Sequence, residues 1–479
     1  MKKLAPFTLP RQILYSVGSL SFNLTERMIL LYAAFYYLPP KEYGLPELFP
    51  GQTFWGILTI FGLVMVVGRV FDALADPVVA SLSDRSTSRL GRRKVFKLIS
   101  ALPMALAAAL IFFPPFNSSE NIINGIWFGI VMSIFYIAFT AYANPFLALV
   151  SELGQDESTR INMNTFIAIL GLLGVALVTV AFTPIVTYLQ SRGVGIRESY
   201  QWAALGFAAI ACIAGYISLL SYDEKKHCLP VEPVDTGIIE SLKRTFGVKH
   251  FVTFLTGELF LMFCVNIVTL GMMYYAVVIF KKDQDFMTYI AGAALLGSMI
   301  SFPFVSYLGK KIGKKKVIVF SVAFFSAAMM LFFILSFMMN ETLVYVCLAL
   351  FVLCGFPLAA LSSLVYSTTS DIAREDALRT GVRREAMFYG ARALPLKIVI
   401  ALSGLTFGFL ISKYGKDVAE PLGVQLSLLV VSICALIGLF FFVRYPEEKV
   451  LSSLKEHEQK IAALSGDTSG KSGEKGPES

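Results

Sequence analysis

The chain has 479 residues, of which 56% are hydrophobic and only 15% charged, and its formal net charge is +8. A soluble domain is about 45–50% apolar and about 25% charged, so this composition excludes a soluble globular protein and indicates a polytopic membrane protein. The positive charge needs no nucleic-acid partner, because cytoplasmic loops of membrane proteins are enriched in Lys and Arg. The six cysteines form no CxxC pair, and the apolar runs hold no Ser/His or metal-ligand constellation, so we expect neither an enzyme nor a bound cofactor.

The apolar runs predict an all-α protein with twelve transmembrane helices, since about 20 apolar residues cross a bilayer. The predicted spans are residues 13–38, 54–82, 95–113, 122–150, 163–189, 200–221, 251–280, 286–307, 317–339, 342–369, 386–411 and 422–443. The longest internal polar segment divides them into an N-terminal six-helix bundle (1–221), a cytoplasmic middle loop (222–249) and a C-terminal six-helix bundle (250–445). The tail, 446–479, is predicted to be largely disordered, because Gly, Ser, Lys and Glu dominate its end.

An internal repeat supports this division. The loop after the second span ends Gly91-Arg92-Arg93-Lys94-Val95, and the loop after the eighth ends Gly313-Lys314-Lys315-Lys316-Val317. Two six-helix halves related as parallel repeats are the layout of the major facilitator superfamily. Because both loops are basic, we expect them and both chain termini to be cytoplasmic.

The second span carries three charges, Arg69, Asp72 and Asp76. Each charge at the bilayer centre costs at least ~2.5–3.5 kcal/mol, so their presence indicates a function. Asp72 and Asp76 are four residues apart and share a helix face, about 6 Å apart along the axis. This stripe predicts a site for a monovalent cation; the alternative is a structural ion pair with Arg69 and Lys397. Na⁺ suits hard oxygen ligands, and H⁺ is equally open because close carboxylates raise one another's pKa.

Lys397 is the only basic residue deep in the eleventh span. A bare ammonium there would be costly unless it were paired, and the carboxylates of the second span are available partners. We therefore expect Lys397 to link the two halves; the alternative is a lysine that snorkels to the end of its span.

An ordered set of motifs resembles a known family. Gly68-Arg69-x-x-Asp72-x-x-x-Asp76-Pro77, followed by the loop Asp84-Arg85-Ser86-Thr87-Ser88-Arg89-x-Gly91-Arg92-Arg93, resembles the signature of the glycoside–pentoside–hexuronide:cation symporters of the major facilitator superfamily. The resemblance implies that Asp72 and Asp76 bind the coupling cation, with Na⁺ as the metal, and that Lys397 connects the cation and substrate sites. It also implies a cytoplasmic gate, whose residues would be Asp84, Arg85, Arg89, Arg92 and Arg93.

The chain departs from this family on the sugar side of the pocket. Asn23 stands where the family has a substrate-binding Asp, and Ala143, with Asn144 beside it, stands at a carboxylate of the cation site. The sugar-stacking aromatic positions are Leu147 and Ser362. The cation half is therefore mostly kept, while the sugar half is largely lost.

Further candidates for coupling or substrate contact are Asn144, Arg69 and the polar residues of spans one and seven. Asn23 and Asn266 occupy repeat-related spans that line the central cavity in this architecture; helix–helix hydrogen bonding is their alternative. Glu26 and Arg27 do not map onto the family, and as neighbours they point about 100° apart. A partner on another helix is one role for Glu26, and substrate contact is the other.

These observations predict a Na⁺- or H⁺-coupled symporter that moves a small solute by alternating access. On the resemblance, the solute is a sugar or glycoside; the lost aromatic residues make a lysolipid or another amphiphile the alternative. A non-transporting receptor or scaffold is a third hypothesis, but it has no use for paired intramembrane acids. We expect a monomer in the lipid bilayer of a bacterial inner membrane.

Overall fold

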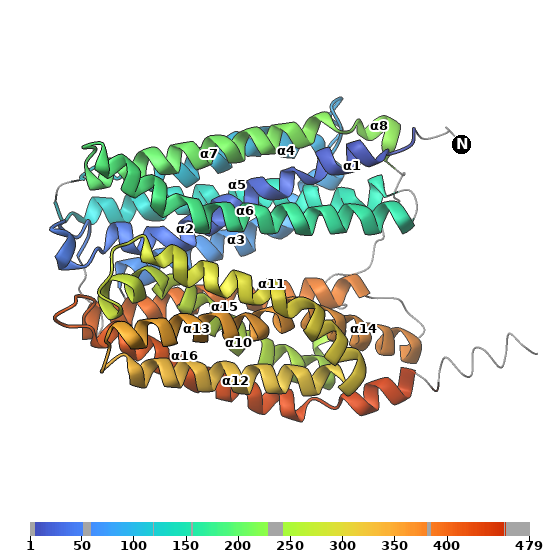
Figure 1. The fold of residues 1–479 in the computed structure, drawn as a ribbon. Helices are drawn as coiled ribbons and strands as arrows, with labels where there is room; N and C mark the ends of the chain where they lie inside the picture. Colours follow the sequence, from blue (N-terminus) through green and yellow to red (C-terminus); the bar gives the residue numbers. More distant parts are fainter. Residues whose placement is uncertain are drawn as a thin grey trace, which may run out of the picture.

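The computed structural model describes residues 5–50, 59–117, 119–154, 157–228, 243–380, 385–454 and 456. Every regular element in these ranges is a helix, as the sequence predicted. The helices run side by side in two groups, with the earlier part of the chain in one group and the later part in the other (Figure 1). The first group contains α1 (Leu9–Ser16), α2 (Gly18–Tyr37), α3 (Ile60–Arg85), α4 (Lys94–Leu110), α5 (Ile122–Leu153), α6 (Glu157–Ser191) and α7 (Ile196–Leu220).

The second group contains α10 (Lys249–Tyr274), α11 (Phe286–Ile312), α12 (Lys314–Leu335), α13 (Glu341–Ala360), α14 (Tyr366–Thr380), α15 (Glu385–Tyr414) and α16 (Leu422–Arg444). The π-helical turn η2 (Tyr275–Ile279) extends α10, and a second such turn, η3 (Leu361–Val365), joins α13 to α14. Counting α1 with α2, and each extended helix as one rod, gives twelve rods. The short elements η1 (Lys41–Tyr43) and α8 (Glu224–His227) lie outside the rods.

Nine helices within the described ranges are long and apolar enough to cross a membrane. The three other rods are not among these nine, and their sequences show why. The α1–α2 rod carries Glu26 and Arg27, α3 carries three charges within the stretch from Arg69 to Asp76, and α4 has only 17 residues. These rods pack among the rest (Figure 1), so charge and shortness, and not a different location, set them apart.

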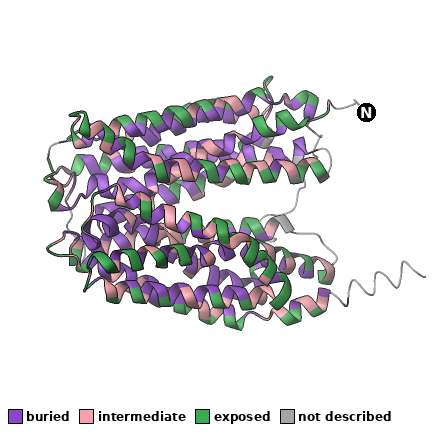
Figure 2. Ribbon diagram, in the orientation of Figure 1, coloured by how far each residue is buried: buried purple, intermediate pink, exposed green. Residues whose placement is uncertain are grey.

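The outer surface of both groups is rich in large apolar side chains, while the buried residues lie between the helices (Figure 2). Leu220 is 79% exposed and Ile99 67%. A soluble monomer rarely exposes large contiguous apolar patches. The exposed belt is therefore the surface that faces the lipid chains.

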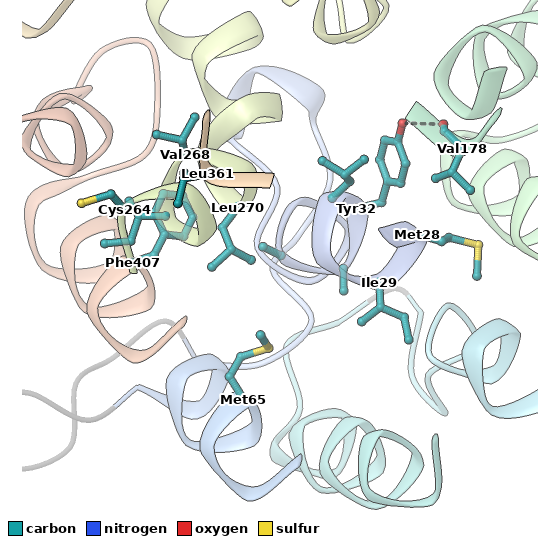
Figure 3. Close-up of a cluster of buried hydrophobic side chains, with 14 of the residues drawn as sticks. Met28, Ile29, Tyr32, Met65, Val178, Cys264, Val268, Leu270, Leu361 and Phe407 are labelled. Carbon is teal, nitrogen blue, oxygen red and sulfur yellow. Dashed lines mark hydrogen bonds between the residues drawn. The ribbon is translucent and has the colours of Figure 1, made fainter. Parts of the chain in front are cut away.

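The two groups pack together through α3 with α15, α2 with α10 and α6 with α11. Met28 and Tyr32 of α2 point away from Val268 and Leu270 of α10, and all four belong to one apolar cluster (Figure 3). The Tyr32 hydroxyl is directed toward α6 and donates a hydrogen bond of 3.3 Å to the Val178 carbonyl. A buried tyrosine hydroxyl needs such an acceptor, and this one ties α2 to α6.

The internal repeat extends to the helix starts behind the basic loops. Gly91 (φ +119°) and Gly313 (φ +96°) precede α4 and α12, in backbone conformations that favour glycine. The Glu224 carboxylate accepts a 3.1 Å hydrogen bond from the Arg93 N–H. Glu447 likewise accepts a 3.0 Å bond from the Lys315 N–H. Each carboxylate follows the last helix of its group and satisfies N–H groups that the helix start leaves without partners.

The two groups are joined by polar contacts at the end opposite the basic loops. Lys41 Nζ lies 2.9 Å from Asp417 Oδ2, and Lys416 pairs with Glu47. At the basic-loop end, Lys314 Nζ lies 2.6 Å from Asp371 Oδ2 within the second group. The fold is therefore fastened across the groups at the opposite end.

Candidate cation and substrate site

Asp76, Asn144 and Lys397 come from three helices that each contain a proline within two residues of this side chain. Pro77 of α3 directly follows Asp76, Pro145 of α5 directly follows Asn144, and Pro395 of α15 stands two residues before Lys397. Proline removes a backbone N–H and frees a carbonyl in the preceding turn. The helical hydrogen-bond ladder is thus interrupted where the charged residues meet.

Lys397 bridges both aspartates of the predicted stripe. Its Nζ lies 2.9 Å from Asp72 Oδ1 and 2.7 Å from Asp76 Oδ2, and it also donates a 3.1 Å bond to the Asp72 carbonyl. Asp72 is 1% exposed, Lys397 17% and Asp76 33%, counted on the side chains. The structure thus places the lysine of the second group against the acids of the first, and it does not snorkel to the end of its helix.

Two polar side chains of α5 complete the surroundings of the aspartates. Thr140 Oγ1 donates to Asp72 Oδ1 at 2.7 Å, and Asn144 Nδ2 donates to Asp76 Oδ1 at 2.9 Å. The sequence singled out Asn144 but not Thr140. The signal that could have found Thr140 is its spacing of four residues from Asn144, which puts both on one face of the helix.

Arg69 forms ion pairs with two acids of the cluster. Its guanidinium lies 3.3 Å from Asp72 Oδ2 and 3.0 Å from Glu26 Oε1, and it stacks 4.4 Å from the centroid of the Tyr136 ring. Glu26 therefore has its partner on a neighbouring helix, which was one of its two expected roles. Tyr136 was not anticipated, because a tyrosine in an apolar run gives no sequence signal of its own.

All four carboxylate oxygens of the two aspartates accept from a donor. Lys397 and Thr140 serve Asp72 Oδ1 and Arg69 serves Oδ2, while Asn144 and Lys397 serve the oxygens of Asp76. A cation that binds these oxygens therefore lies beside donors already in place, and Lys397 is the one donor among the described contacts that both carboxylates share. Within the described ranges, no three or more His, Cys, Asp or Glu side chains gather as a metal site. The available oxygens are those of two carboxylates, the Thr140 hydroxyl and nearby amides.

The charges of this cluster do not balance. Glu26, Asp72 and Asp76 contribute three negative charges, and Arg69 and Lys397 contribute two positive ones. Taken alone, these five residues lack one positive charge; Arg27, next to Glu26 in the chain, is a third cation beside them.

Asn23 and Asn266 lie outside this cluster. Asn23 Nδ2 donates to the Ser19 carbonyl at 2.8 Å and packs against Gly171 of α6. Asn266 Nδ2 donates to the Met262 carbonyl at 2.8 Å. The observed bonds stay within each residue's own helix, so the structure does not bring these amides to the charged residues.

The predicted gate residues are only partly described. Arg92 and Arg93 both pair with the buried Glu152 at the end of α5, with 2.8 Å between Arg93 Nη1 and Glu152 Oε1. Arg89 is exposed. The side chains of Asp84 and Arg85 lie outside the described part of the chain. Glu152, the acid that pairs with both arginines, was not among the predicted gate residues.

A cavity of about 100 Å³ lies between the two groups. Its walls come from α2 and α6 of the first group and from α10 to α13 of the second. The lining is apolar except for Arg27 and the small polar residues Thr179, Thr269 and Cys354. Both threonine hydroxyls donate to their own helices, at 2.7 Å for Thr179 and 2.8 Å for Thr269.

Comparison with known proteins gives a consistent result. A family model described as MFS/sugar transport protein matches residues 14–448. The inner membrane symporter YicJ of Escherichia coli is 24% identical over 451 residues, 90% of each chain. The isoprimeverose transporter of Lactiplantibacillus pentosus is 21% identical and covers 95% of this chain and 92% of its own.

A relative whose name gives a different substrate also matches. The sodium-dependent lysophosphatidylcholine symporter 1 of Xenopus tropicalis is 23% identical over 81% of this chain and 80% of its own. Among solved structures, the nucleoside transporter NupG superposes with a TM-score of 0.63 at 13% identity, covering 91% of this chain and 99% of its own. At that identity the likeness bears on the fold alone, and it confirms the predicted major facilitator fold.

Proposed function

This chain belongs to the MFS/sugar transport protein family, and we propose that its charged cluster couples a Na⁺ or H⁺ gradient to the movement of a small solute. It is a multi-pass membrane transporter, as are the relatives it resembles. The bridge from Lys397 to Asp72 and Asp76 is the observation that carries the coupling proposal. It joins the two helix groups at the residues whose charges a cation would neutralise.

The proposed coupling step is an exchange of partners. A cation that reaches Asp72 and Asp76 competes with Lys397 for their oxygens, because the ammonium already lies against one oxygen of each carboxylate. Release of Lys397 loosens the contact between α3 and α15 and permits the groups to move. Cation binding at these acids thereby affects both halves. It shifts the equilibrium between the two conformations of the carrier only if the cation binds one conformation more tightly than the other.

We propose a sugar or glycoside as the solute, since the isoprimeverose transporter and other relatives carry such names. An amphiphile is the second candidate. It is favoured by the apolar lining of the cavity between the groups and by the likeness to a lysophosphatidylcholine symporter. The family provides the first argument and the local chemistry provides the second.

We also propose a bacterial inner membrane as the location, with the basic loops and both termini in the cytoplasm. The basic loops support this orientation, since Lys and Arg are enriched in cytoplasmic loops. In this orientation the polar contacts between the groups lie on the periplasmic side, and the molecule faces inward. The halves 1–221 and 250–445 are the proposed moving bodies.

Reconstitution in proteoliposomes tests the proposal. An imposed Na⁺ or pH gradient should drive accumulation of a glycoside or lysolipid supplied outside, and Asp72→Asn and Asp76→Asn should abolish the gradient dependence. Glu341→Gln, the same loss of a carboxylate charge at an exposed position at the start of α13, away from the cluster, serves as a reconstitution control. Gradient-driven uptake that both aspartate variants retain in full would refute the assignment of these residues.

A further inference from the structure

Arg27 takes no part in the ion pairs of the cation site. Its guanidinium lines the cavity between the groups, and no carboxylate is among the lining residues. Its neighbour Glu26 is committed to Arg69 at 3.0 Å. Across the described residues we find no hydrogen bond or ion pair to the Arg27 side chain, which stays partly exposed.

A guanidinium in such surroundings is costly. An unpaired charge at membrane depth carries a penalty of several kcal/mol or more, which is why charged residues there pair or serve a function. Lys97 provides the contrast, because it is fully buried yet lies 4.5 Å from the centroid of the Tyr15 ring and donates to Ser218 Oγ at 2.9 Å. Among the described residues, Arg27 has no hydrogen bond or cation–ring contact of this kind, and it lines the cavity instead.

The remaining walls of the cavity define the rest of the ligand. Val265, Val268 and Met272 of α10 face it together with Phe325 and Phe351 of the second group. The threonine hydroxyls of the lining are engaged with their own helices. A carbohydrate ring with several hydroxyls would find few polar partners on these walls, and burying unpaired hydroxyls is unfavourable. An apolar body fits them.

We propose that the cargo is a monoanion with an apolar body, whose carboxylate, phosphate or sulfate binds Arg27 while its apolar part fills the cavity. This inference rests on the proposed transport function and names the substrate class. The surroundings support it: no carboxylate lines the cavity at Arg27, and Glu26 forms its ion pair with Arg69, so an anionic cargo would supply the partner that the lining does not.

Binding to the purified full-length chain, measured by calorimetry, tests this assignment with matched probes. 4-Phenylbutyrate carries the anion and an apolar body, 4-phenylbutan-1-ol has the same body without the charge, and acetate has the anion without the body. Octanoate, compared with octan-1-ol, provides the lipid-like form of the same chemistry. At least one of the two apolar anions should bind about tenfold to a hundredfold tighter than its counterparts, as expected for a buried charge-assisted bond.

Three variants connect the preference to the residue. Arg27→Gln should remove the preference for the anion, Arg27→Lys should restore part of it, and Thr179→Val, on the same cavity wall, should leave it intact. Equal binding of charged and neutral probes, equal binding of acetate, an undiminished preference in Arg27→Gln, or no binding of either apolar anion would each overturn the inference.

A second measurement separates this inference from the proposed symport. The thermal shift caused by Na⁺ or by a change of pH should be lost in Asp72→Asn but kept in Arg27→Gln, which also verifies that the variant is folded. Anion binding that proceeds in Asp72→Asn without any cation dependence would support the anion site and contradict the coupling. A cation response without an anion preference would do the reverse.

Discussion

Lys397 Nζ lies 2.9 Å from Asp72 Oδ1, although the two residues are 325 positions apart in the chain. One is in the eleventh rod and the other in the second, so this contact crosses the boundary between the helix groups. Because Asp76 shares the same ammonium at 2.7 Å, one lysine holds two acids of the opposing helix. A binding event that changes the charge of either acid is felt at once by both halves.

The first prediction concerns the unequal burial of the two acids. Asp72 is 1% exposed and accepts from Lys397, Thr140 and Arg69, whereas Asp76 is 33% exposed. Breaking a buried ion pair from one side costs about 3–5 kcal/mol, and partly exposed pairs cost far less. Asp72→Asn should therefore lower the thermal unfolding midpoint in detergent clearly more than Asp76→Asn, while both abolish the cation-induced shift.

The control for this comparison is Glu258→Gln, which breaks a different buried pair, with Arg392. It should destabilise the protein as Asp72→Asn does but keep the response to the cation. A cation response that survives in Asp72→Asn would show that the cation binds elsewhere.

The second prediction follows from competition between Lys397 and the cation. Lys397→Met keeps an apolar side chain of similar length but removes the ammonium that occupies both carboxylates. The vacated cluster has a larger negative charge, so we expect Na⁺ or H⁺ to bind about tenfold more tightly, corresponding to about 1.4 kcal/mol. Because binding no longer has to release a bridge between the halves, gradient-driven uptake should fall to background.

Titration of the thermal shift with Na⁺, repeated over a pH range, measures this affinity, and uptake into proteoliposomes measures the coupling. Lys397→Arg preserves the charge and should retain weak cation binding like that of the unmodified chain. If Lys397→Met bound the cation more weakly, Lys397 would be a supporting part of the site and not a competitor for it.

Much of this architecture was accessible from the sequence, and the limits of that prediction have physical causes. Charges in an apolar run are conspicuous, so Asp72, Asp76 and Lys397 were identified and their contact was anticipated. Thr140 and Tyr136 are uncharged and common in such runs, so nothing marked them before the facing helices were known. Predicting the partner of Glu26 requires knowing how α2 is rotated relative to α3. Apolar periodicity does not give this rotation in a helix that is hydrophobic on most sides.

The paired helix caps illustrate the same limit. The basic loops revealed the repeat, but the acids that complete them, Glu224 and Glu447, are distant in sequence and lie in polar segments with many charges. Their role became visible only when the ends of α7 and α16 were placed beside the starts of α4 and α12. The tail was expected to be largely disordered over 446–479; the structure gives a helix over 447–454, and the residues after 456 lie outside the described ranges, where the expectation stays a prediction.

The third prediction concerns the acid that caps α4. Burial raises the pKa of Glu224 above its ordinary value. The folded protein therefore holds this proton to a higher pH than the unfolded chain does, and unfolding releases it within that window. The free energy of unfolding consequently falls as the pH rises from the ordinary glutamate pKa, about 4.3, through the raised pKa.

Glu224→Gln keeps an acceptor oxygen for the Arg93 N–H but cannot titrate. The unfolding midpoint of the unmodified chain, measured against this variant, should therefore drop by roughly 2 °C as the pH rises across the window. The other carboxylates titrate in both proteins and cancel in the comparison. A difference that stays constant with pH would mean that Glu224 titrates alike in the folded and unfolded chains.

The fourth prediction addresses the contacts that fasten the groups opposite the basic loops. Lys41 is 78% exposed, whereas Lys416 is 8% exposed in its pair with Glu47. Exposed pairs contribute about 0–1 kcal/mol, and better buried ones contribute more because solvent screens them less. Lys416→Ala should therefore shift the population toward the conformation that opens at this end by severalfold, and Lys41→Ala should shift it less. In a background without native cysteines, the labelling rate of Gln284→Cys, which lies between the groups at this end near Tyr200, reports the opening. Equal rates in both variants and in the unmodified protein would mean that the apolar contacts between α2 and α10, and not these ion pairs, keep this end closed.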